Sequence, residues 1–154
     1  MASDKKARAL GFNHVALEVG DIQEALDFYG RFLDFELQSQ SDTMAFIYFG
    51  DQFVNFSKGR RQAPDDARHL GLVVDDKEAV QQRLDEMGVE ILPGPFLDFL
   101  DPWGNRIEIV GYRNIQFTKA PNVLRGMGLA HLEKSEKALA ELAEKGMAPD
   151  PAGD

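Results

Sequence analysis

The sequence predicts an α+β fold made of two copies of one unit, followed by a C-terminal helix. A phrase of the form His-x-x-Leu-x-Val-x-Asp occurs twice, beginning at His14 and at His69. Each copy runs directly into a helical pattern, and three short strand-like runs follow each helix. An internal repeat of one supersecondary unit predicts two equivalent modules, so the two histidines should occupy matching places in space.

The first module is predicted to span residues 11–57. Its first strand covers 12–19, and Asp21 followed three residues later by Glu24 is typical of a helix start. Apolar residues at helical spacing extend this helix to about Leu33. Strand-like runs follow at 35–40, 44–49 and 52–57, with a tight turn at Gly50-Asp51 between the last two.

The second module is predicted to span residues 68–112, after a polar linker over 58–67. Its first strand covers 69–74, and Asp75 with Glu78 opens a helix that ends near Met87, before Gly88. Strand-like segments follow at 90–92, 95–100 and 106–112, with a hairpin turn at 101–105.

The two modules together form one expected domain over residues 10–112. Residues 1–9 are expected to be a disordered lead and 147–154 a loose tail. Between domain and tail, 113–146 form a C-terminal extension with a helix over 135–145, whose apolar stripe should pack on the body or on a second subunit.

Composition narrows the functional classes. The chain has 154 residues, a formal net charge of −9 and no cysteine, which excludes thiolate metal sites and disulfides and suits the cytoplasm. The acidic balance argues against a nucleic-acid partner, and no apolar run is long enough for a membrane helix. Any bound metal must be held by nitrogen and oxygen.

Strand parity brings three ligand-type side chains to corresponding faces. In the first repeat strand His14 and Glu18 point away from the helix side, and in the second strand His69 does so. On the last strand, Arg106 and Glu108 also face away from the helix, and alignment of the modules puts Asn55 where the second module has Glu108.

Two imidazoles and one carboxylate that converge on a cavity match the facial triad of a divalent metal ion. The alternative is that both histidines are structural residues near strand starts, with hydrogen-bond partners within the protein, and that Glu108 pairs with Arg106 or Arg113.

Four segments of the chain have the pattern of a known protein family. They are residues 14–21, 25–33 and 69–76, and the turn and strand Asp-Pro-Trp-Gly-Asn-Arg-Ile-Glu-Ile at 101–109. In these segments the chain resembles the vicinal oxygen chelate superfamily, which includes glyoxalase I, fosfomycin-resistance transferases, extradiol dioxygenases and bleomycin-resistance proteins.

The resemblance implies paired βαβββ modules that form a cupped half-barrel, a homodimer, and a metal bound by His14, His69 and Glu108. Glyoxalase I has a fourth ligand where this chain has Asn55, a departure that weakens a glyoxalase I assignment.

The expected function is that of a divalent-metal-dependent enzyme acting on a small substrate chelated through two neighbouring oxygens. Fe(II) would favour dioxygenase chemistry; Zn, Mn, Ni or Co would favour isomerase, lyase or transferase chemistry. Glu108 and Glu18 are the catalytic candidates, and Asn55, Arg106 and Tyr48 are substrate-binding candidates.

Other readings stay open. A metal-free protein that binds a small molecule or antibiotic would also suit the acidic charge, and a structural module would have a cup filled by side chains. Whether the site forms within one chain or across two is also open.

Overall fold

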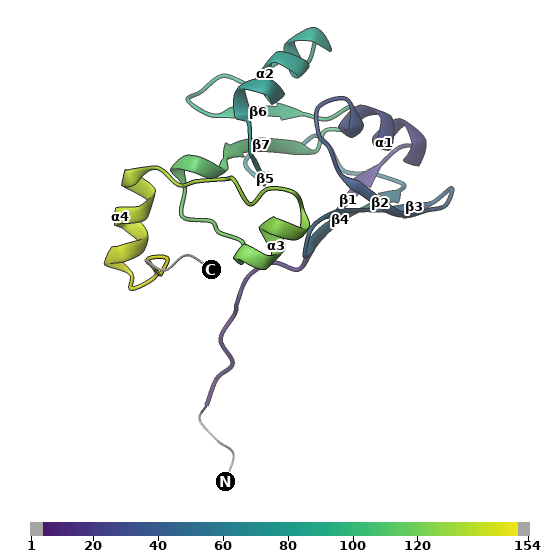
Figure 1. Cartoon of the computed structure of the whole chain (residues 1–154). Helices are drawn as coiled ribbons and strands as arrows, with labels where there is room; N and C mark the ends of the chain where they lie inside the picture. Colours follow the sequence, from purple (N-terminus) through teal and green to yellow (C-terminus); the bar gives the residue numbers. More distant parts are fainter. Residues whose placement is uncertain (1–4, 151–154) are drawn as a thin grey trace.

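The computed structural model describes residues 5–150 and contains two small sheets joined through helices (Figure 1). The first sheet has the strand order β1-β4-β3-β2 and the second the order β5-β7-β6. The expected α+β class and the expected duplication are both confirmed. The first four residues of the expected lead and the last four of the expected tail lie outside the described residues.

The first module consists of one helix and four strands. These are β1 (His14–Val19), α1 (Ile22–Gly30), β2 (Glu36–Gln40), β3 (Met44–Phe49) and β4 (Gln52–Lys58). The Asp21 side chain accepts a hydrogen bond from the Glu24 N–H, which confirms the predicted cap. The helix ends at Gly30, before the predicted Leu33, because glycine weakens a helix and the chain continues in hydrogen-bonded turns.

The second module repeats this order with one strand fewer. It contains β5 (Leu70–Val74), α2 (Lys77–Glu86), β6 (Leu97–Leu100) and β7 (Arg106–Gly111). The predicted strand over 90–92 is wrong: only an isolated bridge between Ile91 and Phe99 forms there, because prolines follow at once and proline cannot donate to a ladder. The cap of α2 is Asp76, not Asp75, since β5 pairs with β7 up to Val74 and the chain leaves the sheet one residue before the helix.

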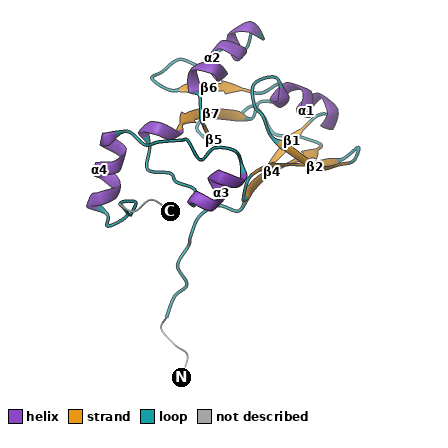
Figure 2. Ribbon diagram, in the orientation of Figure 1, coloured by secondary structure: helices purple, strands orange, loops and turns teal. Residues whose placement is uncertain are grey.

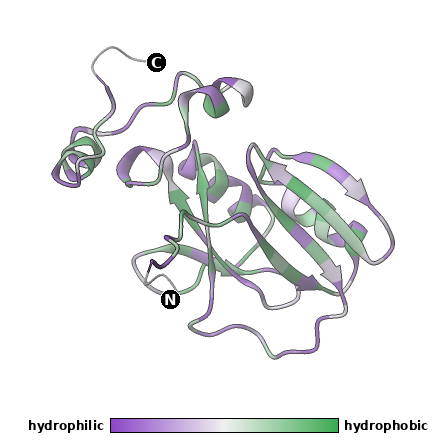
Figure 3. Ribbon diagram, turned by 90° about the horizontal axis from the view of Figure 1, so that it is seen from below, coloured by the Kyte–Doolittle hydropathy of each residue, from purple (hydrophilic) through white to green (hydrophobic). Residues whose placement is uncertain are grey.

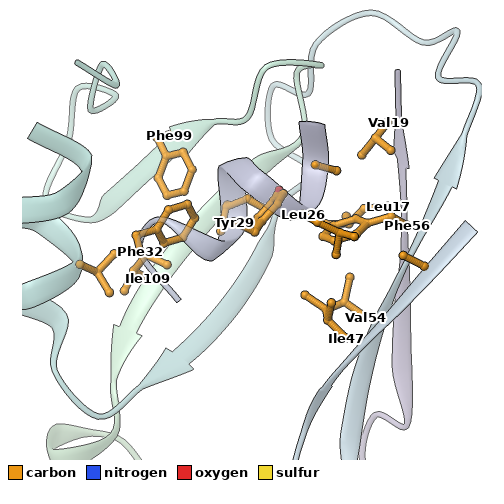
Figure 4. Packing of buried hydrophobic residues seen from close by; sticks show 14 of the residues in the cluster. Leu17, Val19, Leu26, Tyr29, Phe32, Ile47, Val54, Phe56, Phe99 and Ile109 are labelled. Atoms are coloured by element: carbon orange, nitrogen blue, oxygen red, sulfur yellow. The ribbon is translucent and has the colours of Figure 1, made fainter. Parts of the chain in front are cut away.

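The hydrophobic core lies between the helix-bearing sides of the two sheets. Phe28 of α1 and Phe32, in the turn that follows α1, reach across the module boundary to the Phe99 ring, with the Phe32 and Phe99 centroids 5.5 Å apart. Figure 4 shows α1 between the strands of both sheets. Burial of each such side chain stabilises the fold by roughly 1.5–3 kcal/mol. Because both helix-bearing sides are used in this core, the opposite faces of the sheets point outward.

The turn at 101–105 locks the two modules together. The buried Asp101 carboxylate accepts hydrogen bonds from the Tyr29 hydroxyl at 2.8 Å and from Asn105. Asn105 in turn donates to the Glu18 carbonyl of β1. Burial and the neighbouring Asp101 carboxylate raise the pKa of Tyr29 well above its ordinary value, so the phenol keeps the proton that it donates.

A tryptophan closes the same junction. The Trp103 Nε1 atom lies 2.5 Å from the place where a Cβ on Gly20 would stand. Only glycine at position 20 leaves room for this contact.

The C-terminal extension crosses from the second module back to the first. It contains a 3₁₀ turn, Tyr112–Asn114, then α3 (Pro121–Gly126) and α4 (Glu136–Glu144) (Figure 2). The helix predicted over 135–145 is confirmed as α4, which begins after its cap Ser135. Figure 3 shows hydrophobic residues gathered along the strands, whereas α4 lies at the periphery.

Lys134 holds the start of this extension in place. Its ammonium group donates to the carbonyls of Tyr112 and Ile115, each at 2.7 Å, and to that of Phe117, and it lies 3.6 Å from the centre of the Tyr112 ring. Burial lowers the pKa of Lys134 from 10.5 to about 8.

In the described part of the chain, the helices are all too short or too polar to cross a bilayer.

Candidate metal centre

His69 and Glu108 form a pair of ligand-type groups at the open face of the second sheet. The His69 Nε2 atom lies 3.2 Å from Glu108 Oε2, with the side chains 45% and 23% exposed. The other ring nitrogen, Nδ1, lies 2.9 Å from the Ala67 carbonyl oxygen. A carbonyl can only accept, so Nδ1 carries the proton. In the neutral imidazole, therefore, the Nε2 lone pair faces a carboxylate.

His14 stands on the open face of the first sheet and is oriented in a similar way. Its Nδ1 atom lies 2.8 Å from the Asn13 Oδ1 atom. Its ring stacks on Phe53, with centroids 4.7 Å apart and planes 7° apart. When Asn13 accepts the Nδ1 proton, His14 also presents a free Nε2 lone pair.

The three predicted metal ligands do not meet within one chain. In residues 5–150, no group of three or more His, Cys, Asp or Glu side chains is placed to hold a metal ion. The reason is the shared core: the two sheets turn their helix-bearing sides toward each other, so the faces with His14 and with Glu108 point outward. The structure brings together His69 and Glu108 only.

The strand register confirms that Asn55 and Glu108 are equivalent positions. Ala16 pairs with Asn55 in the parallel β1-β4 ladder, and Gly71 pairs with Glu108 in the parallel β5-β7 ladder. Ala16 lies two residues after His14, and Gly71 lies two residues after His69, so the two pairings are equivalent. Asn55 is buried and donates to the Ser57 hydroxyl at 3.0 Å.

Arg106 is engaged with Asp98, not with Glu108. Its Nε atom donates to Asp98 Oδ2 at 2.7 Å, Nη2 contacts the same oxygen, and Nη1 donates to the Asp66 carbonyl. The alternative pairing of Glu108 with Arg106 is therefore not what the structure contains.

The remaining candidates lie on the first sheet. Glu18 is exposed on the same face as His14, next to Ser57 in the ladder. The Tyr48 ring stacks on Phe53 at 4.9 Å, which puts His14, Phe53 and Tyr48 in one aromatic row.

A cavity of about 810 Å³ runs between the modules, and His14 and His69 both line it. The extension closes part of it with Phe117, Leu124 and Met127. The sequence reasoning missed this wall and α3, although Pro121 at a first helical position and Gly128 just past the end were usable signals. It also missed Asn13 and Phe53 as groups that orient His14.

Comparison with known proteins supports the duplicated fold independently. The sequence profile of the Glyoxalase/Bleomycin resistance protein/Dioxygenase superfamily matches residues 11–109. The chain belongs to this superfamily. The extension lies beyond the matched region.

Several relatives have a recorded activity or a solved structure. The chain is 31% identical over 109 residues to the glutathione transferase FosA of Serratia marcescens, covering 63% of this chain and 77% of FosA. It resembles a protein from the mobile metagenome of V. Pseudocholerae (25% identity, TM-score 0.56, 71% and 100% coverage). It also resembles the fosfomycin resistance protein FosX of Listeria monocytogenes (18% identity, TM-score 0.59, 68% and 94% coverage). A mutant of that FosX was solved with Mn(II) and 1S,2S-dihydroxypropylphosphonic acid.

Proposed function

We propose that two copies of this chain form a divalent metal centre, with His14 from one protomer and His69 and Glu108 from its partner. The protein would be an enzyme that acts on a small molecule chelated through two neighbouring oxygens. The observation that carries the proposal is the His69–Glu108 pair. Nε2 of His69 lies 3.2 Å from Glu108 Oε2, while Nδ1 is turned to the Ala67 carbonyl, so in the neutral ring the Nε2 lone pair faces the carboxylate.

This pair fits a metal ion well. An unprotonated nitrogen and a carboxylate oxygen repel each other unless a cation, either a second ring proton or a metal ion, binds to both. Two ligands each about 2.1 Å from one ion stand about 3.0–3.4 Å apart, and the observed separation lies in this range. The donor set of two imidazoles and one carboxylate suits Mn, Fe(II), Co, Ni or Zn.

The fold supports sharing the centre between protomers. β1 and β5 each lie at the edge of their sheet, and in the described residues no further strand pairs with either edge. Open edges are normally covered by association. A two-fold dimer that sets the open face of the first module against that of the second would create two equal sites.

The chain's own residues then have distinct tasks. Asn13 and Phe53 hold the His14 ring, and Ala67 fixes the tautomer of His69. When bound, the ion would supply Lewis acidity to the substrate oxygens. Glu18 is the proton acceptor closest in sequence on the His14 face, and Tyr48 and Asn55 offer hydrogen-bonding groups from the same sheet. The relationship to FosA favours transferase chemistry over dioxygenase or lyase chemistry.

Complementation between inactive variants tests the shared site. Chelator-stripped protein is titrated with Mn(II); wild type is expected to bind one ion per chain, and His14→Ala and Glu108→Ala to bind none tightly. Refolding these two variants together should restore about one quarter of the sites, because half of the randomly formed dimers contain one intact site of two.

In the matched control, the His69→Ala and Glu108→Ala variants are refolded together. Both changes damage the same half-site, so this mixture should stay without tight Mn(II) binding. Restoration in neither mixture, with wild type binding normally, would show that each site belongs to one chain. A wild-type protein that retains no divalent ion would refute the metal centre.

The mostly apolar lining of the cavity favours one competing function, that of a metal-free small-molecule binder. Such a protein has no need for the His69–Glu108 pair. Binding of an apolar or cationic compound that is unchanged in Glu108→Ala and independent of metal would support this reading instead.

A further inference from the structure

The positively charged side chains near the proposed metal centre already form ion pairs or hydrogen bonds with other groups of the same chain. The Arg106 side chain lies on the same face of β7 as Glu108, two residues away along the strand. Yet two of its nitrogens contact Asp98 Oδ2 and the third donates to the Asp66 carbonyl. Asp98, whose side chain is only 6% exposed, is also the direct ladder partner of Glu108.

The cavity that His14 and His69 line, to which Glu108 and Arg106 do not contribute, has the same pattern of paired cations. Lys119 lines it with a side chain only 9% exposed, and its ammonium is paired with Asp51. Lys134, behind the extension, donates its protons to three backbone carbonyls. In the described part of the chain, the other carboxylate and ammonium groups that line the cavity are Asp34, Asp75 and Asp76. The lining is therefore acidic, and its one lysine is already neutralised.

A phosphonate dianion would be poorly matched to these surroundings. A doubly charged group that leaves water needs charged donors in addition to the metal, and here the nearest guanidinium and ammonium groups are committed to carboxylates. The three aspartates of the cavity that His14 and His69 line add negative charge, which would repel it. A neutral or singly charged chelator can be satisfied by the ion and by neutral donors.

On the basis of the metal centre proposed above, we propose that the site takes neutral or singly charged oxygen chelators and discriminates against phosphonate dianions. Asp98 is the specificity-determining residue, because it holds Arg106 away from the ligand. The chain would thus combine a FosA-like framework with a different substrate class.

Two probes of different charge test this inference on the Mn(II)-loaded dimer. Acetohydroxamate chelates through two oxygens as a single anion, and phosphonoformate chelates through two oxygens with higher charge. Isothermal titration is expected to show wild type binding acetohydroxamate at least about tenfold more tightly than phosphonoformate. Asp98→Asn, which frees Arg106, should raise phosphonoformate affinity about tenfold and change acetohydroxamate affinity less than about twofold.

A second variant, which releases Lys119 from its carboxylate partner, keeps the test valid if Asp98→Asn does not fold. Asp51 is 57% exposed, so Asp51→Asn should fold normally, and by freeing Lys119 it should raise phosphonoformate affinity by a smaller factor. Asp85→Asn, on the exposed side of α2, removes the same charge at a position that does not line the cavity and should change the affinity for neither probe.

The outcomes separate the two proposals. Equal wild-type affinity for the two probes, or no gain in either releasing variant beyond the Asp85→Asn control, overturns the specificity proposal alone. Failure of the wild type to bind Mn(II), measured before any probe is added, overturns the metal centre and this inference with it.

Discussion

The two modules share their opening and differ in how they end. Both have a histidine where an edge strand begins, His14 as the first residue of β1 and His69 directly before β5, and both continue into an aspartate-capped helix. At the equivalent ladder position, however, the first module has the buried amide Asn55 and the second has the carboxylate Glu108. The difference teaches that the duplication supplied the same scaffold twice, whereas a carboxylate at this ladder position is present in the second copy only.

The supports of the two histidines differ as well. Asn13, a side chain, accepts from His14, whereas a backbone carbonyl accepts from His69. The ring of His14 also stacks on Phe53, and His69 instead faces Glu108. The surroundings of His14 can therefore be altered by single side-chain substitutions that have no counterpart at His69.

Removing the equivalent polar group from each module should have very unequal effects. Glu108→Ala is expected to lower Mn(II) affinity about 100-fold or more, since it removes one of the proposed ligands and leaves His69 without its carboxylate partner. Asn55→Ala should lower it less than about threefold. Metal titration of both variants, with thermal unfolding to verify folding, measures the contrast; similar losses would contradict the asymmetry.

The next largest effect concerns stability at the turns that close each sheet. Asp101→Ala is expected to lower the free energy of unfolding by about 3 kcal/mol, because it leaves Tyr29 and Asn105 without their buried acceptor. Asp51→Ala, in the corresponding turn of the first module, should lower it by less than about 1 kcal/mol, since the Asp51 side chain is itself 57% exposed. Urea denaturation checks both, and equal losses would refute the role of Asp101 as the lock.

A moderate effect should follow from loosening the first histidine alone. Asn13→Ala is expected to lower Mn(II) affinity about tenfold, because the His14 tautomer and ring orientation are no longer fixed. Asn13→Asp keeps an acceptor and should retain the wild-type affinity. A loss in the aspartate variant as large as in the alanine variant would show that Asn13 acts through packing instead.

The smallest expected effect lies outside both modules, at Lys134. Burial lowers its pKa to about 8 from 10.5, so between these pH values the unfolded chain binds more protons than the folded one and stability must rise with pH. The measurement is the difference in free energy of unfolding between wild type and Lys134→Met. This difference, wild type minus variant, is expected to increase from pH 8 to pH 10. A difference that stays flat over this interval would contradict the burial of the ammonium group.

Much of this arrangement follows from local patterns in the sequence. Strand parity correctly gave the shared faces, and alignment of the modules correctly matched Asn55 with Glu108, because both depend only on the period of two along a strand. The Asp21 cap follows from spacing in the same way.

Other features depend on contacts between distant segments. The apolar face of α1 could be read from the sequence, but not that Phe28 and Phe32 would meet Phe99 of the other module, which turns the two open faces apart. The pairing of Arg106 with Asp98 depends on the β6-β7 register, and α3 is a six-residue helix too short for a periodic signal.

The junction of Gly20 and Trp103 gives the molecule a built-in optical reporter. The chain contains one tryptophan, and its indole is pressed against the end of β1 where the modules meet. Separation of the modules would hydrate that ring and shift its emission to longer wavelength. Intrinsic fluorescence can therefore follow the docking of the two halves without any added label.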